Sequence, residues 1–337
     1  MFGSWVAFAL SLFLLGCTNG GKDKSATNGT GAVAAKGEFP YVEVPLYITN
    51  RAEALCYSID KFWNPYLFKA SRDTSLYSID TKTFEKAYAQ YIELLQVLEN
   101  NYGSFEGDDA RRAANVVANS HKKIFEAADS LYLAGHKKLL MRLIEMSERY
   151  LYNPNSPFLN EELYIPVVDA VLELRSIDSL HKMQHVYQKN MVMLNRKGTV
   201  ASNFDYEYLL PDRRPAYSSL HKTDAEYLLI YFNNPGCASC KEIEAILSNN
   251  QTVAYMLEEG RLKVISMYID KDIKSWEERF AMAPRNWIYA RDYMNQFEAN
   301  ELYGIRAIPS MYLLGKGKEV ILKDAPAERI VEYFGNQ

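Results

Sequence analysis

The sequence predicts an α+β chain of two domains, an all-helical bundle followed by an α/β domain. Between about residues 40 and 197, apolar side chains recur at helical spacing in several blocks. From Lys197 onward, short runs of β-branched and aromatic residues alternate with amphipathic stretches, which is typical of a partly parallel sheet with helices. The chain has 337 residues, of which 48% are hydrophobic, and this is enough to fill two cores.

The first domain is expected to consist of helices. Asp80 and Thr81 can cap a helix over residues 82–98, which carries one apolar stripe. The stripe consists of Phe84, Ala87, Tyr88, Tyr91, Leu94, Leu95 and Leu98. Further helices are expected from Asp108 or Asp109 to about residue 133, and over residues 136–151, 160–174 and 179–194.

The second domain is expected to alternate strands with helices. Phe204, Tyr206 and Tyr208 alternate with other residues as in a half-buried strand. Further strands are expected over residues 227–232, 263–269, 310–314 and 319–322, and a final helix over residues 327–334.

The most informative motif is Cys237-Ala238-Ser239-Cys240, which follows the apolar strand over residues 227–232 and opens an amphipathic stretch. A helix N-terminus has unpaired N–H groups and a partial positive charge, so it favours a thiolate. We therefore expect Cys237 to be the nucleophile. The spacing lets Cys240 close back onto it, so that the pair can be reduced or oxidised, as thiol–disulfide exchange requires.

This order of elements, followed by the segment Tyr303-Gly-Ile-Arg-Ala-Ile-Pro-Ser-Met-Tyr-Leu-Leu314, resembles the thioredoxin fold. The resemblance implies a cis bond before Pro309, beside the cysteines, where backbone groups of Ile308 pair with an extended substrate. It also implies that Cys237 attacks a substrate disulfide and that Cys240 resolves the mixed disulfide. No organic cofactor is implied.

The chain departs from the usual thioredoxin motif Trp-Cys-Gly-Pro-Cys-Lys. Gly236 stands in place of the Trp, Ala238 and Ser239 replace Gly-Pro, and Tyr231 replaces the buried acid six residues before the nucleophile. These departures keep a second function open, that of a non-catalytic binding or scaffold lipoprotein that retains the fold.

The base that deprotonates Cys240 is not identified by the sequence. Glu242 and Glu244 are nearby, but glutamates on a helix are usually solvated. The residues between the two cysteines do not by themselves set the direction of exchange, so reduction, oxidation and isomerisation all stay open.

The N-terminus is expected to be a signal peptide. An apolar stretch over residues 5–15 is too short to span a bilayer and leads into Leu14-Leu15-Gly16-Cys17, which resembles the bacterial lipobox. The resemblance implies that Cys17 becomes the lipidated first residue of the mature protein. No Lys or Arg precedes the apolar stretch, and a plain secretory signal or an N-terminal anchor is the alternative. The expected organisation is a signal peptide (1–16), a flexible tether (17–38), a helical domain (39–197) and a thioredoxin-like domain (198–337).

This layout resembles the thioredoxin-like lipoproteins of Gram-negative bacteria that carry a helical N-terminal domain of unknown function. The resemblance implies a lipid-anchored protein of the cell envelope that faces the periplasm, with the choice between inner and outer membrane left open. Protein disulfides or dithiols are the implied substrates, and a membrane redox donor or a thiol protein is the implied redox partner. The net charge of −4, without basic runs, argues against nucleic acid.

Other reactive side chains are expected to be structural. Cys56 lies on an apolar helical face, where a buried inert thiol is favoured over a redox partner. The dithiol has no second C-x-x-C to complete a zinc site, and His181 and His185, which can share a helix face, are not expected to bind metal. The remaining histidines are expected at wet surfaces; they are His121, His136 and His221.

Overall fold

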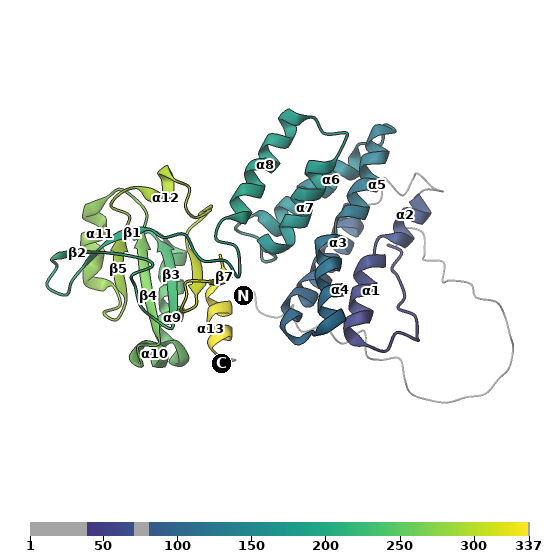
Figure 1. Ribbon diagram of the computed structural model, residues 1–337. Helices are drawn as coiled ribbons and strands as arrows, with labels where there is room; N and C mark the ends of the chain where they lie inside the picture. Colours follow the sequence, from purple (N-terminus) through teal and green to yellow (C-terminus); the bar gives the residue numbers. More distant parts are fainter. Residues whose placement is uncertain (1–38, 71–80, 336–337) are drawn as a thin grey trace. The chain divides into compact units, whose positions relative to one another are not determined.

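The structure, a computed structural model, describes residues 39–70 and 81–335 of the chain (Figure 1). A helical region comes first and a mixed sheet with its own helices follows, which confirms the predicted α+β arrangement. The helices before the sheet are α1 (Arg51–Lys61), α2 (Asn64–Ala70), α3 (Thr81–Asn100), α4 (Gly107–Ala118), α5 (Lys122–Leu133), α6 (Lys138–Ser147), α7 (Glu161–Glu173) and α8 (Ser179–Met193). The predicted cap residue Asp80 lies outside the described residues.

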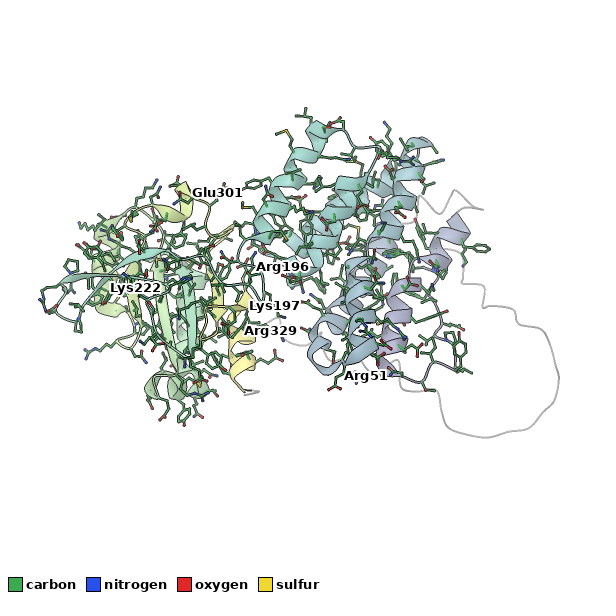
Figure 2. All side chains as sticks on the ribbon, viewed as in Figure 1. Arg51, Arg196, Lys197, Lys222, Glu301 and Arg329 are labelled. Carbon is green, nitrogen blue, oxygen red and sulfur yellow. A yellow bond between two sulfur atoms is a disulfide. The ribbon has the colours of Figure 1, made fainter. Side chains whose placement is uncertain are left out.

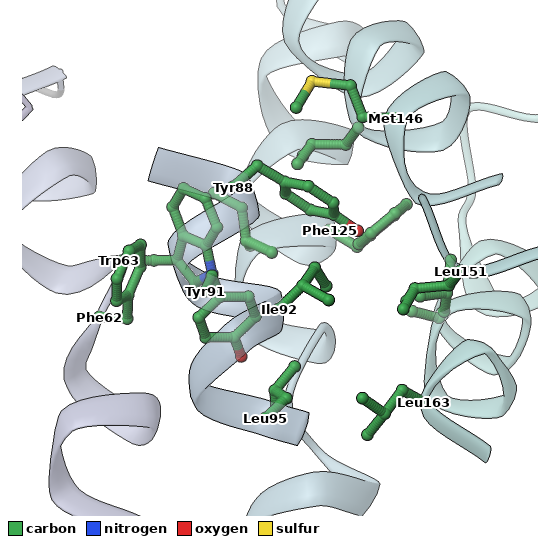
Figure 3. Packing of buried hydrophobic residues seen from close by; sticks show 14 of the residues in the cluster. Phe62, Trp63, Tyr88, Tyr91, Ile92, Leu95, Phe125, Met146, Leu151 and Leu163 are labelled. Carbon is green, nitrogen blue, oxygen red and sulfur yellow. The ribbon is translucent and has the colours of Figure 1, made fainter. Parts of the chain in front are cut away.

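Aromatic rings fill the core around α3. Figure 3 shows Phe62 and Trp63, which directly follow α1, beside Tyr88 and Tyr91 of α3. The ring centroid of Tyr91 lies 5.0 Å from that of Phe62 and 5.2 Å from that of Trp63. The predicted stripe of α3 is buried except for Leu94, which is half-buried. Because each buried aromatic side chain stabilises the fold by roughly 1.5–3 kcal/mol, this cluster is a major source of the bundle's stability.

The single long helix predicted up to residue 133 is wrong, because the chain forms α4 and α5 with a turn between them. The side-chain amide of Asn119 donates to the carbonyl oxygen of Asn115 at 2.9 Å. Such local hydrogen bonds compete with the helix backbone and favour a break. Asp108 and Asp109 lie inside the first turn of α4, so they do not cap it from outside.

The turn between α4 and α5 directs His121 into the core, so the expectation of a wet surface is wrong for this histidine. The ring nitrogens of His121 lie 2.9 Å from the Ser120 hydroxyl and 3.3 Å from the Tyr88 hydroxyl. Tyr88 in turn lies 2.6 Å from the Ser147 hydroxyl. His121 therefore belongs to a buried polar network.

The last helices of the bundle follow the predicted pattern. α6 runs into a π-helical turn (Glu148–Tyr152), and the chain then breaks before α7. The side chain of Asn160 caps α7 by accepting from the Leu163 N–H at 3.0 Å. Asp178 caps α8 in the same way, accepting from the His181 N–H at 2.9 Å. Both caps satisfy N–H groups that the helix itself leaves unpaired.

The described part of the second domain contains one seven-stranded sheet in the order β2-β1-β5-β4-β3-β6-β7. Its strands are β1 (Asp205–Leu209), β2 (Pro215–Ser219), β3 (Tyr227–Asn233), β4 (Leu262–Tyr268), β5 (Ile288–Arg291), β6 (Ser310–Leu314) and β7 (Val320–Lys323). β3 pairs with β4 in parallel and with β6 antiparallel. The sequence pattern does not predict β2 or β5, because β2 is an edge strand without buried apolar alternation and β5 is only four residues long.

The two faces of the sheet have separate cores. Alternate residues of a strand point to opposite faces, and on β3 Ile230 belongs to one core whereas Tyr231 belongs to the other. The core on the Tyr231 face also contains residues of α9 (Ala238–Asn249), α10 (Gln251–Glu258) and α13 (Ala327–Gly335). Two further helices are α11 (Ile273–Arg279) and α12 (Gln296–Ala299).

The chain passes from α8 to the sheet through Arg196 and Lys197, which are labelled in Figure 2. Buried charges also join α7 to the second domain. The Glu161 carboxylate lies 2.5 Å from a guanidinium nitrogen of Arg306, which precedes β6, and 2.5 Å from the ammonium of Lys323, on β7. These three side chains are at most 14% exposed.

Within residues 39–70 and 81–335, no helix combines the length and apolar character needed to cross a bilayer. The predicted signal peptide, lipidated Cys17 and tether lie outside the described residues.

Candidate dithiol site

The strand β3 leads the chain to the site. Its seven residues are buried or half-buried, and it ends at Asn233 inside the sheet. The next residue, Asn234, shapes the loop: its side-chain oxygen accepts from the Gly236 N–H at 3.2 Å, and its carbonyl oxygen accepts from the Cys237 N–H at 3.1 Å. A side-chain turn of this kind is a common way to fix a short loop. The loop therefore presents Cys237 at a defined place beyond the strand.

Cys237 occupies the N-cap of α9. Its backbone is extended (φ −82°, ψ 118°), and its sulfur accepts from the Cys240 N–H at 3.1 Å. Cys237 and Cys240 are joined as a disulfide with their Cα atoms 5.2 Å apart. Cys240 is only 4% exposed, whereas Cys237 is half-buried. Cys237 is therefore the more exposed of the two cysteines, at the positive end of a helix, whereas Cys240 is sheltered in the core.

The loop before β6 leads into the strand that pairs with β3. Ser310 pairs with Phe232 near the end of β3, which places Pro309 next to the strand that leads to Cys237. The peptide bond between Ile308 and Pro309 is cis. Ile308 packs against the same core that contains both cysteines.

Tyr231 takes the place that an acid has in the thioredoxin motif. Its hydroxyl donates to the carbonyl oxygen of Cys240 at 2.6 Å, across from strand to helix. Burial raises the pKa of Tyr231 well above its ordinary value. Tyr231 therefore stays protonated at neutral pH and cannot serve as a carboxylate would.

The other predicted neighbours of the dithiol lie on its outer side. Gly236, Ala238 and Ser239 are exposed, in the loop and the first turn of α9. They leave the surface around Cys237 open, and none of them supplies a charge.

The contact that anchors the loop before Cys237 is not predicted by the sequence pattern. The Asn234 side chain donates to the Asp270 carboxylate at 2.9 Å, which ties the loop after β3 to the loop after β4. The signal in the sequence is weak, because Asp270 lies 36 residues away and only the pairing of the two strands brings it close.

The remaining candidate residues do not join the site. Cys56 is a free thiol and is buried in the helical core, as predicted. The ring of His185 is buried and lies 2.9 Å from the side-chain oxygen of Gln188, whereas His181 is exposed and pairs with Asp178. The described residues hold no group of three His, Cys, Asp or Glu that could bind a metal ion.

A family model matches residues 16–196, which is more than half of the 337 residues. Its description is a domain of unknown function, DUF5106. The chain belongs to the DUF5106 family. The match includes the helices α1 to α8, and the dithiol lies beyond it, in the second domain.

One solved structure matches both the DUF5106 region and the sheet domain. A thioredoxin-like protein from Bacteroides caccae is 27% identical, with a TM-score of 0.75, and the match covers 89% of this chain and 98% of that one. It confirms the thioredoxin-like fold.

Two further solved structures match a shorter part of the chain. The C-terminal domain of an uncharacterized protein from Bacteroides fragilis is 34% identical over 42% of this chain and 98% of that one, with a TM-score of 0.39. The thioredoxin domain of a thiol-disulfide oxidoreductase from Bacteroides vulgatus is 16% identical over 42% and 96% of the two chains, with a TM-score of 0.35. No curated protein matches the chain.

Proposed function

We propose that this chain is an exported, lipid-anchored thiol–disulfide oxidoreductase that exchanges disulfides with proteins of the cell envelope through Cys237 and Cys240. The observation that carries the proposal is the half-buried Cys237 at the N-cap of α9, disulfide-bonded to a sheltered Cys240. Exchange needs one accessible sulfur that is stabilised as a thiolate and one partner that can resolve the adduct. The thioredoxin-like fold supports the proposal.

In the reducing direction, the Cys237 thiolate attacks one sulfur of a substrate disulfide, and the other substrate sulfur leaves as a thiolate. A mixed disulfide between Cys237 and the substrate results. Cys240 then loses its proton and bonds to Cys237, which releases the second substrate sulfur as a thiolate. The protein is left as a disulfide, so a membrane redox donor or a partner thiol protein must reduce it again. The oxidising direction is the same path reversed.

Backbone groups near Pro309 are the proposed binding place for substrate. The loop that carries Ile308 lies beside the end of β3, and Ile308 contacts the core that contains both cysteines. An extended segment of a protein substrate can pair with such a backbone as an added strand. Protein disulfides and dithiols are therefore the substrate class that we propose.

The Cys240→Ser variant tests the exchange function. Cys237 should still attack a substrate disulfide, but without Cys240 the mixed disulfide cannot be resolved. Natural substrates should therefore accumulate as adducts that migrate as larger species on non-reducing gels and disappear after reduction. The Cys237→Ser/Cys240→Ser double variant is the matched control, and it should form none. Equal absence of adducts from both variants would contradict the proposal.

Lipid anchoring at Cys17 is proposed from the sequence alone. The Cys17→Ala variant should keep its signal peptide and carry no lipid, because the residue that receives the lipid is gone. Mass spectrometry of the purified protein measures both properties. A mature, acylated form of this variant would rule out Cys17 as the anchor.

A binding or scaffold lipoprotein is the second candidate. Tyr231 in place of the buried acid and Gly236 in place of the Trp favour it, because both positions serve catalysis in the thioredoxin motif. Titration against glutathione separates the two functions. A reduction potential above about −300 mV supports exchange, whereas a pair that resists reduction at that potential supports a scaffold.

A further inference from the structure

Glu244 lies on the buried side of α9. It follows Cys240 by four residues and precedes Leu247 by three, so the three side chains share one face of the helix. Cys240 and Leu247 are buried, and the Glu244 side chain is only 22% exposed, whereas Glu242 is exposed. The expectation that both glutamates are solvated is therefore wrong for Glu244.

Arg279 holds the Glu244 carboxylate in place from a second helix. One guanidinium nitrogen of Arg279, at the end of α11, donates to both carboxylate oxygens at 2.8 Å. The Arg279 side chain is only 15% exposed, so water competes little for this pair. Helical side chains lean towards the N-terminus of their helix, and this carries the Glu244 carboxylate towards the turn that contains Cys240.

Two buried tyrosines lie within the electric field of this pair. Tyr231 donates to the carbonyl oxygen of Cys240, and its pKa is raised first by burial and then by the charge of Glu244, against the opposing effect of Arg279. Burial also raises the pKa of Tyr289, on which the charges of Arg279 and Glu244 act as well. The Tyr289 hydroxyl is buried without a hydrogen-bond partner in the described part of the chain. Glu244 therefore lies close enough to the buried Tyr231 and Tyr289 side chains for its charge to act on them.

We infer that Glu244, positioned by Arg279, accepts the proton that Cys240 loses when it resolves a mixed disulfide. The inference rests on the proposed function, because Cys240 must lose a proton only if it resolves a mixed disulfide. In this inference, Glu244 on α9, held by Arg279 on α11, takes the role of the acid that Tyr231 replaces on β3.

The step balances without a further reagent. The Cys240 thiol gives its proton to the Glu244 carboxylate, and its sulfur bonds to the sulfur of Cys237. The bond between Cys237 and the substrate sulfur breaks, and that sulfur leaves with the electron pair as a thiolate. Glu244 then returns the proton to the leaving thiolate or to water, so the cysteine pair is oxidised as the substrate is reduced.

The size of the effect is limited by the chemistry of thiols. A thiol with an ordinary pKa of about 8.5 is already about 3% ionised at pH 7, so a base can accelerate the attack of such a thiol there by roughly 30-fold, and that of a buried thiol by more. We expect the isosteric Glu244→Gln variant to resolve mixed disulfides about 10-fold more slowly near neutral pH. As the pH rises to about 10 its rate should approach that of the wild type, because more of the thiol then ionises without a base.

The reaction of the reduced protein with an aromatic disulfide, which releases a coloured thiolate, records both attack steps in one stopped-flow measurement. The first equivalent of colour reports the attack of Cys237, and the second reports the attack of Cys240 on the adduct. Stopped-flow traces across a pH series should show a slower second phase for Glu244→Gln and an unchanged first phase, which also shows that the variant is folded. Glu242→Gln is the matched control on the same helix, and both of its phases should equal those of the wild type.

The other outcomes overturn the inference in distinct ways. If Glu244 acts only through its charge, its removal leaves Arg279 unopposed, the Cys240 thiol ionises more readily, and the second phase becomes faster near neutral pH. Equal second phases at every pH would assign the pair a structural role alone. A wild type that releases no second equivalent would instead defeat the proposed function.

Discussion

His121 shows what burial does to a single residue in this chain. It is completely buried, and its neighbours are uncharged: the hydroxyls of Tyr88 and Ser120 lie at its ring nitrogens, and the rings of Tyr91 and Phe125 lie around it. Burial lowers the pKa of His121 to about 3. The folded protein therefore keeps this imidazole neutral at pH values where the unfolded chain charges it.

This difference predicts a loss of stability in mild acid. The folded pKa lies below the unfolded value of about 6.5, so the contribution is complete above that value and is lost as the pH falls from there towards about 3. At about pH 5.5 the free energy of unfolding should be lower by about 1.4 kcal/mol than at about pH 8 on account of His121. Denaturant unfolding at the two pH values measures it. His121→Gln should lose this part of the pH dependence, and the exposed His136→Gln should keep it.

At the dithiol, the sequence predicts the position of the cysteines but not the burial of the residues around them. The motif from Cys237 to Cys240 and its place at a helix start could be predicted, because a strand followed by a helix is encoded by local spacing. The burial of Glu244 could not, because it depends on Arg279, which is 35 residues away in the sequence. Spacing along α9 puts Glu244 on the side of Cys240, but it cannot say which element covers that side.

At the scale of elements, caps mark where helices begin. α10 follows α9 with Asn250 between them, and the side-chain oxygen of Asn250 accepts from the Val253 N–H at 3.0 Å. The cap lets the chain leave one helix and start another at a single residue. The two helices then both contribute to the core beneath the sheet, with Leu247 from α9 and Met256 from α10.

Asn250→Ala should destabilise the protein by about 1 kcal/mol, the usual cost of losing an N-cap side chain. Asn249, the preceding residue, is exposed at the end of α9, and Asn249→Ala should change the free energy of unfolding by less than about 0.5 kcal/mol. Denaturant unfolding of the two variants side by side gives the comparison. A similar loss for both would mean that the cap contributes no more than an ordinary surface position.

Elements with a strong period were predictable and those without one were not. α3, α7 and α8 lie where helical spacing predicts them, and so does the buried strand β3. The sequence pattern does not predict the break between α4 and α5. The break is stabilised by hydrogen bonds of Ser120 and His121 to tyrosines of α3. That choice depends on packing between helices, which no local period records.

At the scale of the whole molecule, a buried ion cluster connects α7 with the second domain. Glu161 contacts both Arg306 and Lys323. The guanidinium of Arg306 also lies over the ring of Tyr152, 4.0 Å from its centroid, and Lys323 donates to the Leu194 carbonyl oxygen at 2.6 Å. Because Arg306 precedes the loop that carries Pro309, the cluster supports the backbone beside the dithiol.

Removing the central carboxylate should be costly. Glu161→Ala removes the carboxylate that lies 2.5 Å from two buried cations and leaves Arg306 with only the more distant Asp324, at 3.6 Å, so we expect the free energy of unfolding to fall by about 3–5 kcal/mol. The neighbouring Glu162 pairs with Arg196, which is 40% exposed, so Glu162→Ala should cost no more than about 1 kcal/mol. Denaturant unfolding of both variants checks the difference, and equal losses would contradict the importance of burial in the cluster.

The sequence predicts the two-domain α+β plan, most of the helices, the central strand and the position of the dithiol, because periodicity and short motifs are local properties of a chain. It does not predict which polar side chains are buried or which groups they contact, because these depend on the packed fold. Glu161 and Arg306 are 145 residues apart, and Glu244 and Arg279 are 35 apart. Contacts over such separations exist only after strands and helices have packed, since the energy of a buried charge depends on every element around it.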